Sequence, residues 1–247
     1  MSLLQLEDIS KKFGQVVVGE SISFQLEQGD ALGIVGPNGA GKTSLFAMIS
    51  GDVLPDSGTI RFDGHDVAHL SAAKRARAGI GRTYQVPRPF ENMSVFENAL
   101  LAAQQGARTR GQKSYEIAYG ALERTELLNF ANRPAGSLGL LHRKRLELAR
   151  ALATSPRVLL LDEIAGGLTD LEVNELTHII RGFRNDGIAV VWIEHVVRAL
   201  LTTVDRLLCL ANGVVVADGE PKAVLASDAV RSVYLGGRIL TTDVSHE

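Results

Sequence analysis

The sequence predicts an α/β fold made of a strand-containing core and an inserted helical subdomain. Strand-like segments cluster towards the two ends of the 247-residue chain, whereas helical periodicity dominates from about residue 94 to residue 153. A glycine-rich loop joins an apolar strand to a helix-forming run in the first cluster. We therefore expect one domain over residues 1–247, in which residues 1–85 and 155–247 form the α/β core and residues 86–154 form the helical subdomain.

Individual elements are expected where the hydrophobic pattern has the period of a strand or of a helix. Short apolar or alternating runs predict strands at Leu3–Ile9, Ser21–Leu26, Ala31–Val35, Thr59–Phe62, Val158–Leu161, Ala189–Ile193, Arg206–Leu210 and Val214–Asp218. In the helical subdomain, three stretches have apolar residues at helical spacing, marked by Phe96, Leu100 and Leu101, by Ile117, Leu122 and Leu127, and by Leu146, Leu148 and Leu152. The polar segment Gly106–Gly111 is expected to be a solvated turn inside this subdomain.

Composition argues against several classes of function. A net charge of −2, with charges spread along the chain, predicts no nucleic-acid partner. The longest apolar stretches, Val158–Leu161 and Ile188–Ile193, are far shorter than the ~20 residues of a membrane-spanning helix, so we expect a water-soluble chain. Residues 1–10 lack the basic and apolar regions of a secretion signal. The single cysteine, Cys209, lies in an apolar run and is expected to be a core residue in a reducing compartment.

The glycine-rich loop has the full pattern of a phosphate-binding loop. Its glycines leave the backbone free to turn N–H groups towards phosphate oxygens, and the following helix points the positive end of its dipole at the same charge. Lys42 is expected to reach the β and γ oxygens of a nucleoside triphosphate, and the Thr43 hydroxyl is expected to hold Mg²⁺. A tight turn with a chance Lys-Thr pair is the alternative. The expected nucleotide-binding residues are Gly36, Pro37, Asn38, Gly39, Ala40, Gly41, Lys42, Thr43 and Ser44.

Polar residues also follow three other apolar segments. Asp162 and Glu163 end a buried strand, where Asp162 is predicted to hold a water on Mg²⁺ and Glu163 to polarise the water that attacks the γ-phosphate. His195 closes the next strand, and because parallel strands end around one crevice, it is predicted to sense the γ-phosphate and support that water. Gln85 follows Gly79–Tyr84 and is predicted to reach the metal or its waters. The alternatives are an acidic turn, a core histidine and a surface glutamine.

The order of these motifs resembles that of the ATP-binding subunits of ABC transporters over nearly the whole chain. The matching features are GPNGAGKT at Gly36–Thr43, Gln85, a helical insert ending in Arg143–Leu152, the run Leu159–Glu163 and His195. More closely, three segments resemble the ATPases of branched-chain amino-acid importers, namely Gly79–Gln85, Leu146–Leu152 and Val233–Gly236.

This resemblance implies more than the motifs alone predict. It implies a P-loop NTPase core with an N-terminal antiparallel β subdomain and an inserted α-helical subdomain. ATP and Mg²⁺ are the implied cofactors, and ATP hydrolysis is the implied activity. The adenine-stacking aromatic of the family falls on Phe13, which could equally be a core residue of a short hairpin.

One motif departs from the family pattern. Members hydrolyse ATP as sandwiched dimers, in which a Leu-Ser-Gly-Gly-Gln signature of one subunit closes on the ATP of the other. The signature positions of this chain, counted back from Arg150, are Leu138, Gly139, Leu140, Leu141 and His142. Gly139 therefore stands at the serine position and Leu141 at the second glycine position, with Leu140 at the first, although Ser137, two residues earlier, is an alternative cap for the helix.

The resemblance also implies partners and a location. The expected partners are multi-span permease subunits, a second ATPase with an intact signature in a heterodimer, and, indirectly, a periplasmic or surface solute-binding protein. The chain is expected at the cytoplasmic face of the inner or plasma membrane. Val86–Val95 and the helical subdomain are predicted to contact the permease, with a Pro-rich turn packed on its own domain as the alternative. An ATPase of lipopolysaccharide export and a soluble ABC protein outside transport are the alternative functions.

Overall fold

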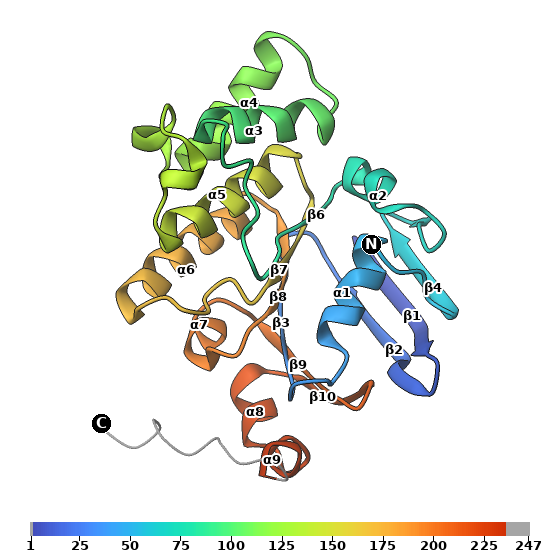
Figure 1. Ribbon diagram of the computed structural model, residues 1–247. Helices are drawn as coiled ribbons and strands as arrows, with labels where there is room; N and C mark the ends of the chain where they lie inside the picture. The colour runs from blue at the N-terminus through green and yellow to red at the C-terminus, as the bar shows by residue number, and fades with distance from the viewer. Residues whose placement is uncertain (1, 236–247) are drawn as a thin grey trace.

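A six-stranded sheet forms the centre of the computed structural model, which describes residues 2–235 (Figure 1). Its strand order is β10-β9-β3-β8-β7-β6, and all neighbouring strands run parallel except β10 and β9. The strands are β3 (Ala31–Val35), β6 (Ile80–Arg82), β7 (Val158–Asp162), β8 (Ala189–Ile193), β9 (Arg206–Ala211) and β10 (Val214–Gly219). The predicted bounds of β3 and β8 are confirmed to the residue.

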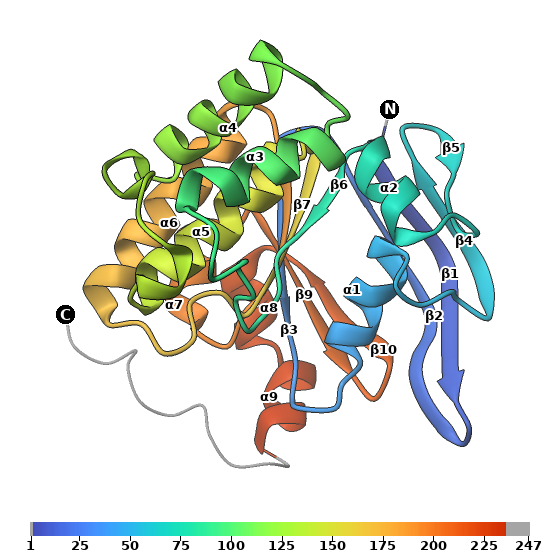
Figure 2. The same ribbon diagram turned by 45° about the horizontal axis from the view of Figure 1, so that its top comes forward.

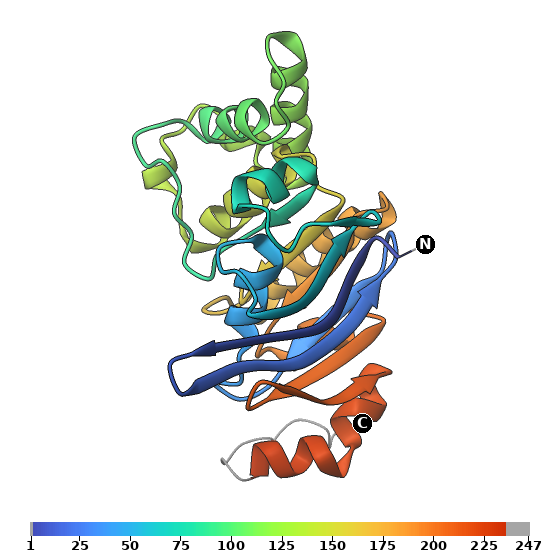
Figure 3. The same cartoon turned by 90° about the vertical axis from the view of Figure 1, so that its right-hand side faces the viewer.

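A second, antiparallel sheet has the order β2-β1-β4-β5. Figure 3 shows the long strands of this sheet. Its strands are β1 (Leu4–Phe13), β2 (Val16–Leu26), β4 (Ser57–Phe62) and β5 (His65–Asp66). The first two predicted strands were too short, because β1 and β2 stay paired down to Phe13 and Val16 at the hairpin turn. The predicted fold class, with its N-terminal antiparallel part, is confirmed.

Helix α1 (Lys42–Ser50) packs between the two sheets, and α6 (Asp170–Asn185) covers the other face of the six-stranded sheet (Figure 1). Successive strand residues point to opposite faces. Leu160 accordingly joins the core around α1, whereas Leu161 joins the core around α6. Both faces of the sheet are therefore buried, which is why its strands read as continuous apolar runs.

The remaining helices of the α/β part are short. They are α2 (Ala72–Ala78), α7 (Val197–Leu201), α8 (Pro221–Ala226) and α9 (Asp228–Leu235). Cys209 is buried in β9, as predicted for a core residue. Gly236, the last residue of one segment used for the family resemblance, lies outside the described residues. Among residues 2–235, no helix has the length and apolar character needed to cross a membrane.

Three longer helices between β6 and β7 gather at one end of the molecule (Figure 2). They are α3 (Val95–Gln105), α4 (Gln112–Arg124) and α5 (Leu140–Ala153), with 3-10 turns at Leu128–Phe130 and Ala135–Ser137. A core of their own holds them together, and it includes Val95, Leu122 and Leu146. Ser94 begins α3 through a capping box with Glu97, which explains the abrupt start of helical structure there.

Candidate nucleotide site

The phosphate-binding loop lies between the carboxyl end of β3 and the start of α1. Gly36 and Gly41 both have positive φ, and their backbones lie against other backbone segments. A Cβ atom on Gly36 would lie 2.0 Å from the Leu210 carbonyl oxygen, and one on Gly41 would lie 2.1 Å from that of Val18. These contacts leave no room for a side chain at either position, so the loop shape requires glycine.

Lys42 is folded into this loop. Its side chain is only 5% exposed, and its Nζ donates to the carbonyl oxygens of Gly36 at 2.7 Å and Pro37 at 3.0 Å. Burial lowers the pKa of the Lys42 ammonium, and the charges of Glu163 and Asp162 oppose that shift. Helix α1 begins here at the N-cap Gly41 without a side-chain cap, and within residues 2–235 no side chain is bonded to its first N–H groups. This arrangement presents N–H donors and a cation to an anionic ligand.

The other predicted loop residues have graded exposure. Asn38, Gly39 and Thr43 are exposed, Pro37 and Ser44 are half-buried, and Ala40 is buried. Phe13 is 49% exposed at the tip of the β1–β2 hairpin, and the Lys11 ammonium lies 5.3 Å from its ring centroid. The alternative reading of Phe13 as a core residue is therefore wrong, because the hairpin tip extends beyond the packed interior.

Asp162 ends β7 and is 3% exposed. Burial raises the pKa of its carboxyl, and Arg82 opposes the shift through a charge-assisted bond in which Nη2 lies 3.1 Å from Oδ2. Arg82 ends the neighbouring strand β6, and its Nη1 donates to Asp52 at 2.9 Å and to Ser50 at 3.0 Å. Arg82 was not among the predicted site residues, although it lies within the segment Gly79–Gln85 that carried part of the family resemblance.

Three predicted residues meet where β6, β7 and β8 end, and we call Gln85, Glu163 and His195 the strand-end cluster. Nε2 of Gln85 donates to Oε2 of Glu163 at 2.6 Å, and Nε2 of His195 lies 2.9 Å from Oε1 of Glu163. Glu163 has a left-handed backbone, with φ of 48°. Such a conformation persists at a non-glycine residue only when its surroundings fix it. The expectation that these side chains come together is met.

The signature segment, residues 138–142, starts α5. Gly139 is the N-cap residue and offers no side-chain oxygen, Leu140 is 46% exposed, and the His142 ring packs on Phe130 with centroids 4.2 Å apart. Burial lowers the pKa of His142. The Ser137 hydroxyl donates to the Pro134 carbonyl oxygen at 2.7 Å. The alternative in which Ser137 caps this helix is therefore wrong, because Ser137 belongs to the preceding 3-10 turn.

A pocket of about 300 Å³ separates the strand-end cluster from α5. It is lined by Gln85, Val86, Pro87, Leu140, Lys144, Glu163 and Gly166. Lys144 is 4% exposed, and burial lowers its pKa while the charges of Glu194 and Glu163 oppose the shift. This pocket brings polar groups from two parts of the chain to one place.

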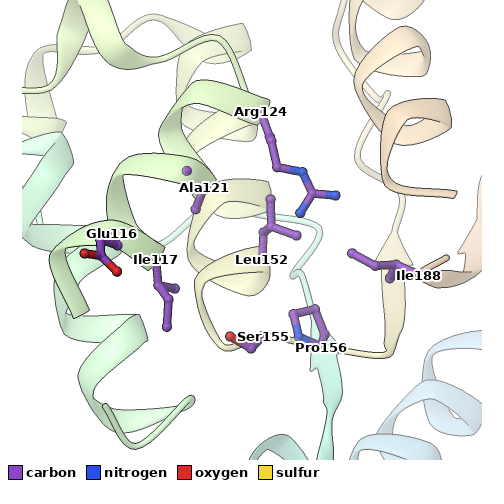
Figure 4. Close-up of a pocket in the computed structure, with 9 residues that line it drawn as sticks. Glu116, Ile117, Ala121, Arg124, Leu152, Ser155, Pro156 and Ile188 are labelled. Carbon is purple, nitrogen blue, oxygen red and sulfur yellow. The ribbon is translucent and has the colours of Figure 1, made fainter. Parts of the chain in front are cut away.

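A second pocket, of about 340 Å³, contains none of the predicted site residues. Figure 4 shows that its walls come from α4, from the end of α5 and from the segments that precede β7 and β8. Arg124, on its wall, is already paired with Asp186. Since ligands of parallel sheets bind beyond the carboxyl ends of strands, we assign no nucleotide contact to this pocket.

Known proteins resemble this chain over nearly its whole length. Residues 20–166 match the family described as ABC transporter. The high-affinity branched-chain amino acid transport ATP-binding protein BraF of Pseudomonas aeruginosa is 32% identical, with 95% of this chain and 98% of that protein covered. The lipopolysaccharide export system ATP-binding protein LptB of Escherichia coli strain K12 is 33% identical, with 96% and 98% covered.

Solved structures agree with these relatives. A nucleotide-free ATP-binding cassette from an ABC transporter superposes with a TM-score of 0.88 at 29% identity, covering 95% of this chain and 99% of that one. An ATP-binding cassette of an ABC transporter in its ADP conformation gives a TM-score of 0.86 at 30% identity, covering 96% and 99%. Both superpositions cover nearly all of this chain.

Proposed function

Because this chain belongs to the ABC transporter family, whose members are ATP-hydrolysing transporter ATP-binding proteins, we propose that it drives solute uptake through a membrane permease. Branched-chain amino acids or related small polar solutes are the proposed class, supported by the similarity to BraF and by the segments Gly79–Gln85 and Leu146–Leu152. The observation that carries the hydrolytic part of the proposal is the strand-end cluster, in which an acid lies between an amide and an imidazole.

In this proposal the loop residues 36–44 bind the triphosphate of ATP. Backbone N–H groups and Lys42 meet the phosphate oxygens, and the exposed ring of Phe13 stacks on the adenine. Thr43, Asp162 and Gln85 supply oxygen atoms, which are the ligands that Mg²⁺ prefers, so they fit a magnesium ion or its waters. A magnesium ion held by these residues would offset charge on the β- and γ-phosphates.

Glu163 is the proposed base. Its two carboxylate oxygens already have one partner each, so the carboxylate is held in one orientation when it accepts a proton from water. His195 would hold the Glu163 carboxylate and contact the γ-phosphate, while Gln85 would reach the metal or its waters. Residues of this chain would thus bind ATP, orient the Glu163 carboxylate and accept the proton from water.

A pair of substitutions tests these roles. Glu163→Gln should bind ATP normally but hydrolyse it roughly 10²- to 10⁴-fold more slowly, because it removes the base and leaves the phosphate contacts intact. Lys42→Ala should instead lose ATP binding. Fluorescent ATP binding and single-turnover hydrolysis by the assembled transporter measure the two effects, and full turnover in Glu163→Gln would refute the assignment.

Residues 86–154 are proposed to act as a helical subdomain that contacts the permease, chiefly through Val86–Val95. Val86 is 64% exposed and Phe90 is 48% exposed, while Asn98 bonds the Phe90 backbone and Arg150 lies over the Phe90 ring. An exposed apolar surface on a fixed backbone suits a short helix of a membrane partner.

Charge substitutions at Phe90 and Met93 test this contact. They should uncouple transport from hydrolysis while ATP binding stays normal, because neither side chain belongs to the phosphate site. Cysteine cross-linking to the permease gives a direct measurement. Cross-links that never reach the permease would contradict the proposal.

The proposed assembly is a heterodimer at the cytoplasmic face of the membrane, where a second ATPase with an intact signature closes on the ATP held here. A periplasmic or surface solute-binding protein would deliver the solute to the permease.

The similarity to LptB supports lipopolysaccharide export as a second candidate function. Co-purified partners and uptake of labelled leucine into proteoliposomes distinguish the two. Export is favoured if leucine uptake stays at background while lipopolysaccharide is extracted from the vesicles.

A further inference from the structure

Glu194 is a buried acid that lies beside the strand-end cluster. It follows the last residue of β8, directly before His195, and it is 2% exposed. A carboxylate this deeply buried is costly unless hydrogen bonds offset its lost hydration. Burial raises the pKa of Glu194, and backbone N–H groups of Ala165, His195 and Val196 oppose the shift.

The two carboxylate oxygens of Glu194 serve two different loops. Oε1 accepts from the Ala165 N–H at 2.6 Å, in the loop that follows β7 and begins with Glu163. Oε2 accepts from the N–H groups of His195 at 2.9 Å and Val196 at 3.3 Å, in the loop that follows β8. One side chain therefore ties together the backbones that carry Glu163 and His195.

Both loops need such a tie. Glu163 has a left-handed backbone, and its N–H donates to the Ile193 carbonyl oxygen at 2.9 Å, so the β7 loop turns away from its strand immediately after this bond. The Glu163–His195 contact at 2.9 Å joins two side chains that are 19% and 45% exposed. An exposed contact of this kind contributes little by itself, so its geometry depends on the backbones beneath it.

We propose that Glu194 is a positioning residue for ATP hydrolysis, which clamps the loops after β7 and β8 so that Glu163 and His195 meet in one fixed geometry. The inference rests on the proposed function of this site. Lys144 of α5 is buried and lines the same pocket as Glu163, so the helical part of the chain lies next to the clamped loops.

Glu194→Gln tests the clamp with almost no change in shape. A glutamine has one acceptor oxygen and an NH₂ group that cannot accept, so it must release one of the two loops. We expect the turnover of the assembled transporter to fall at least roughly tenfold, while the affinity for ATP changes less than about twofold. Amide hydrogen exchange at Ala165 or at His195 and Val196 should accelerate on the order of tenfold, because a buried bond to a charged acceptor is lost.

Asp30→Asn is the matched control. Asp30 is a half-buried acid whose carboxylate also accepts a backbone N–H, that of Glu27 at 2.7 Å, and it precedes β3 at the end of the sheet opposite to the strand-end cluster. Neutralising it should leave turnover and the amide exchange of both loops unchanged. Glu194→Asp keeps the charge but is one methylene shorter, so it reaches at most one loop and should also slow turnover; it decides the test if Glu194→Gln does not fold.

Glu163→Gln, measured in parallel, separates this inference from the proposed function. If Glu163→Gln is slow but a folded Glu194→Gln or Glu194→Asp hydrolyses ATP at the wild-type rate, the clamp is refuted and the site stands. If Glu163→Gln itself retains full turnover, the proposed site fails first. A double variant that is no slower than Glu163→Gln alone would support action of Glu194 through Glu163.

Discussion

The strand-end cluster and the signature segment differ in the polar side chains that each offers to a nucleotide. In the strand-end cluster, both oxygens of Glu163 have side-chain partners, and Glu194 holds the loops below. In the signature segment, α5 begins with a glycine cap and the half-exposed Leu140. The side chains proposed to act on the chain's own nucleotide are thus in place, whereas the segment proposed to face a partner's nucleotide has no hydroxyl at its N-cap. Two ATP sites in such a dimer need not be equal, because each draws its halves from different chains.

The largest expected effect comes from comparing the two sites in the proposed heterodimer. Glu163→Gln in this chain should abolish most hydrolysis, whereas the matching change in the partner should have a small effect. Loss of one donor to a transition-state oxygen typically slows turnover about 10²- to 10³-fold, so we expect the site closed by the signature segment to be slow in the wild type. Steady-state hydrolysis by the reconstituted complex measures both variants. Equal losses, or vigorous hydrolysis by a homodimer of this chain, would contradict the asymmetry.

A smaller effect is expected at Arg82, whose guanidinium group is paired with Asp162. Arg82→Met removes the cation that opposes the raised pKa of Asp162, so that pKa should rise further. The carboxylate is the form proposed to act, and hydrolysis should therefore be lost at a higher pH than in the wild type as pH falls. Removing a supporting group typically costs about 10- to 100-fold in metal affinity or activity. The pH–rate profile and the Mg²⁺ dependence measure this, and Arg82→Lys, which keeps the charge, is the control. Overlapping profiles for Arg82→Met and wild type would contradict it.

A gain of function is expected at Gly139, in the signature segment. No atom lies within 4 Å of a Cβ built there, and its φ of −69° and ψ of 170° suit an N-cap serine. Gly139→Ser should therefore raise hydrolysis at the slow site by about a few-fold, with Leu141 still limiting close approach. The measurement uses a complex whose fast site carries Glu163→Gln.

Gly120→Ser is the matched control for this gain, since that glycine also has open space but lies in α4. Gly139→Ser with no gain, while Gly139→Ser/Leu141→Gly has one, would place the defect in Leu141 instead of the missing hydroxyl.

The smallest effect is expected at Ser137. Its hydroxyl is bonded to the Pro134 carbonyl oxygen, so Ser137→Ala should change hydrolysis less than about twofold. Turnover of the complex and the thermal unfolding temperature of the chain are the measurements. A large loss of turnover with unchanged unfolding would mean that Ser137 replaces the missing signature serine after all.

The sequence predicted the parts of the site whose position follows from local rules. Lys42 follows a loop whose shape depends on glycine, and Asp162, Glu163 and His195 stand at the ends of parallel strands, which must meet at one edge of the sheet. Arg82 and Glu194 were missed because their roles arise from neighbours far along the chain, Asp162 and Ala165. No spacing rule marks a buried carboxylate that serves backbone N–H groups.

The fold shows the same division. Strands β3 and β8 were predicted to the residue, since full burial gives each a continuous apolar run. The ends of β1 and β2 were not, because residues 11–13 carry no strand pattern and pair through the geometry of the hairpin. The start of α5 was also hard to predict from sequence. A shift of two residues decides whether Ser137 or Gly139 is the N-cap of this helix.

Strand β6, which joins the three-helix part to the sheet, forms only a short ladder with its neighbour. It is the outermost strand, it has three residues, and it pairs only with β7 among the described strands. The chain leaves for the helices from the end of β6 and returns into β7, its direct neighbour. Strand β3, three strands inward, has two ladders instead of one. Leu148 and Leu152 of α5 also pack into the core around α6, so side-chain packing holds the helices to the sheet beside the short ladder of β6.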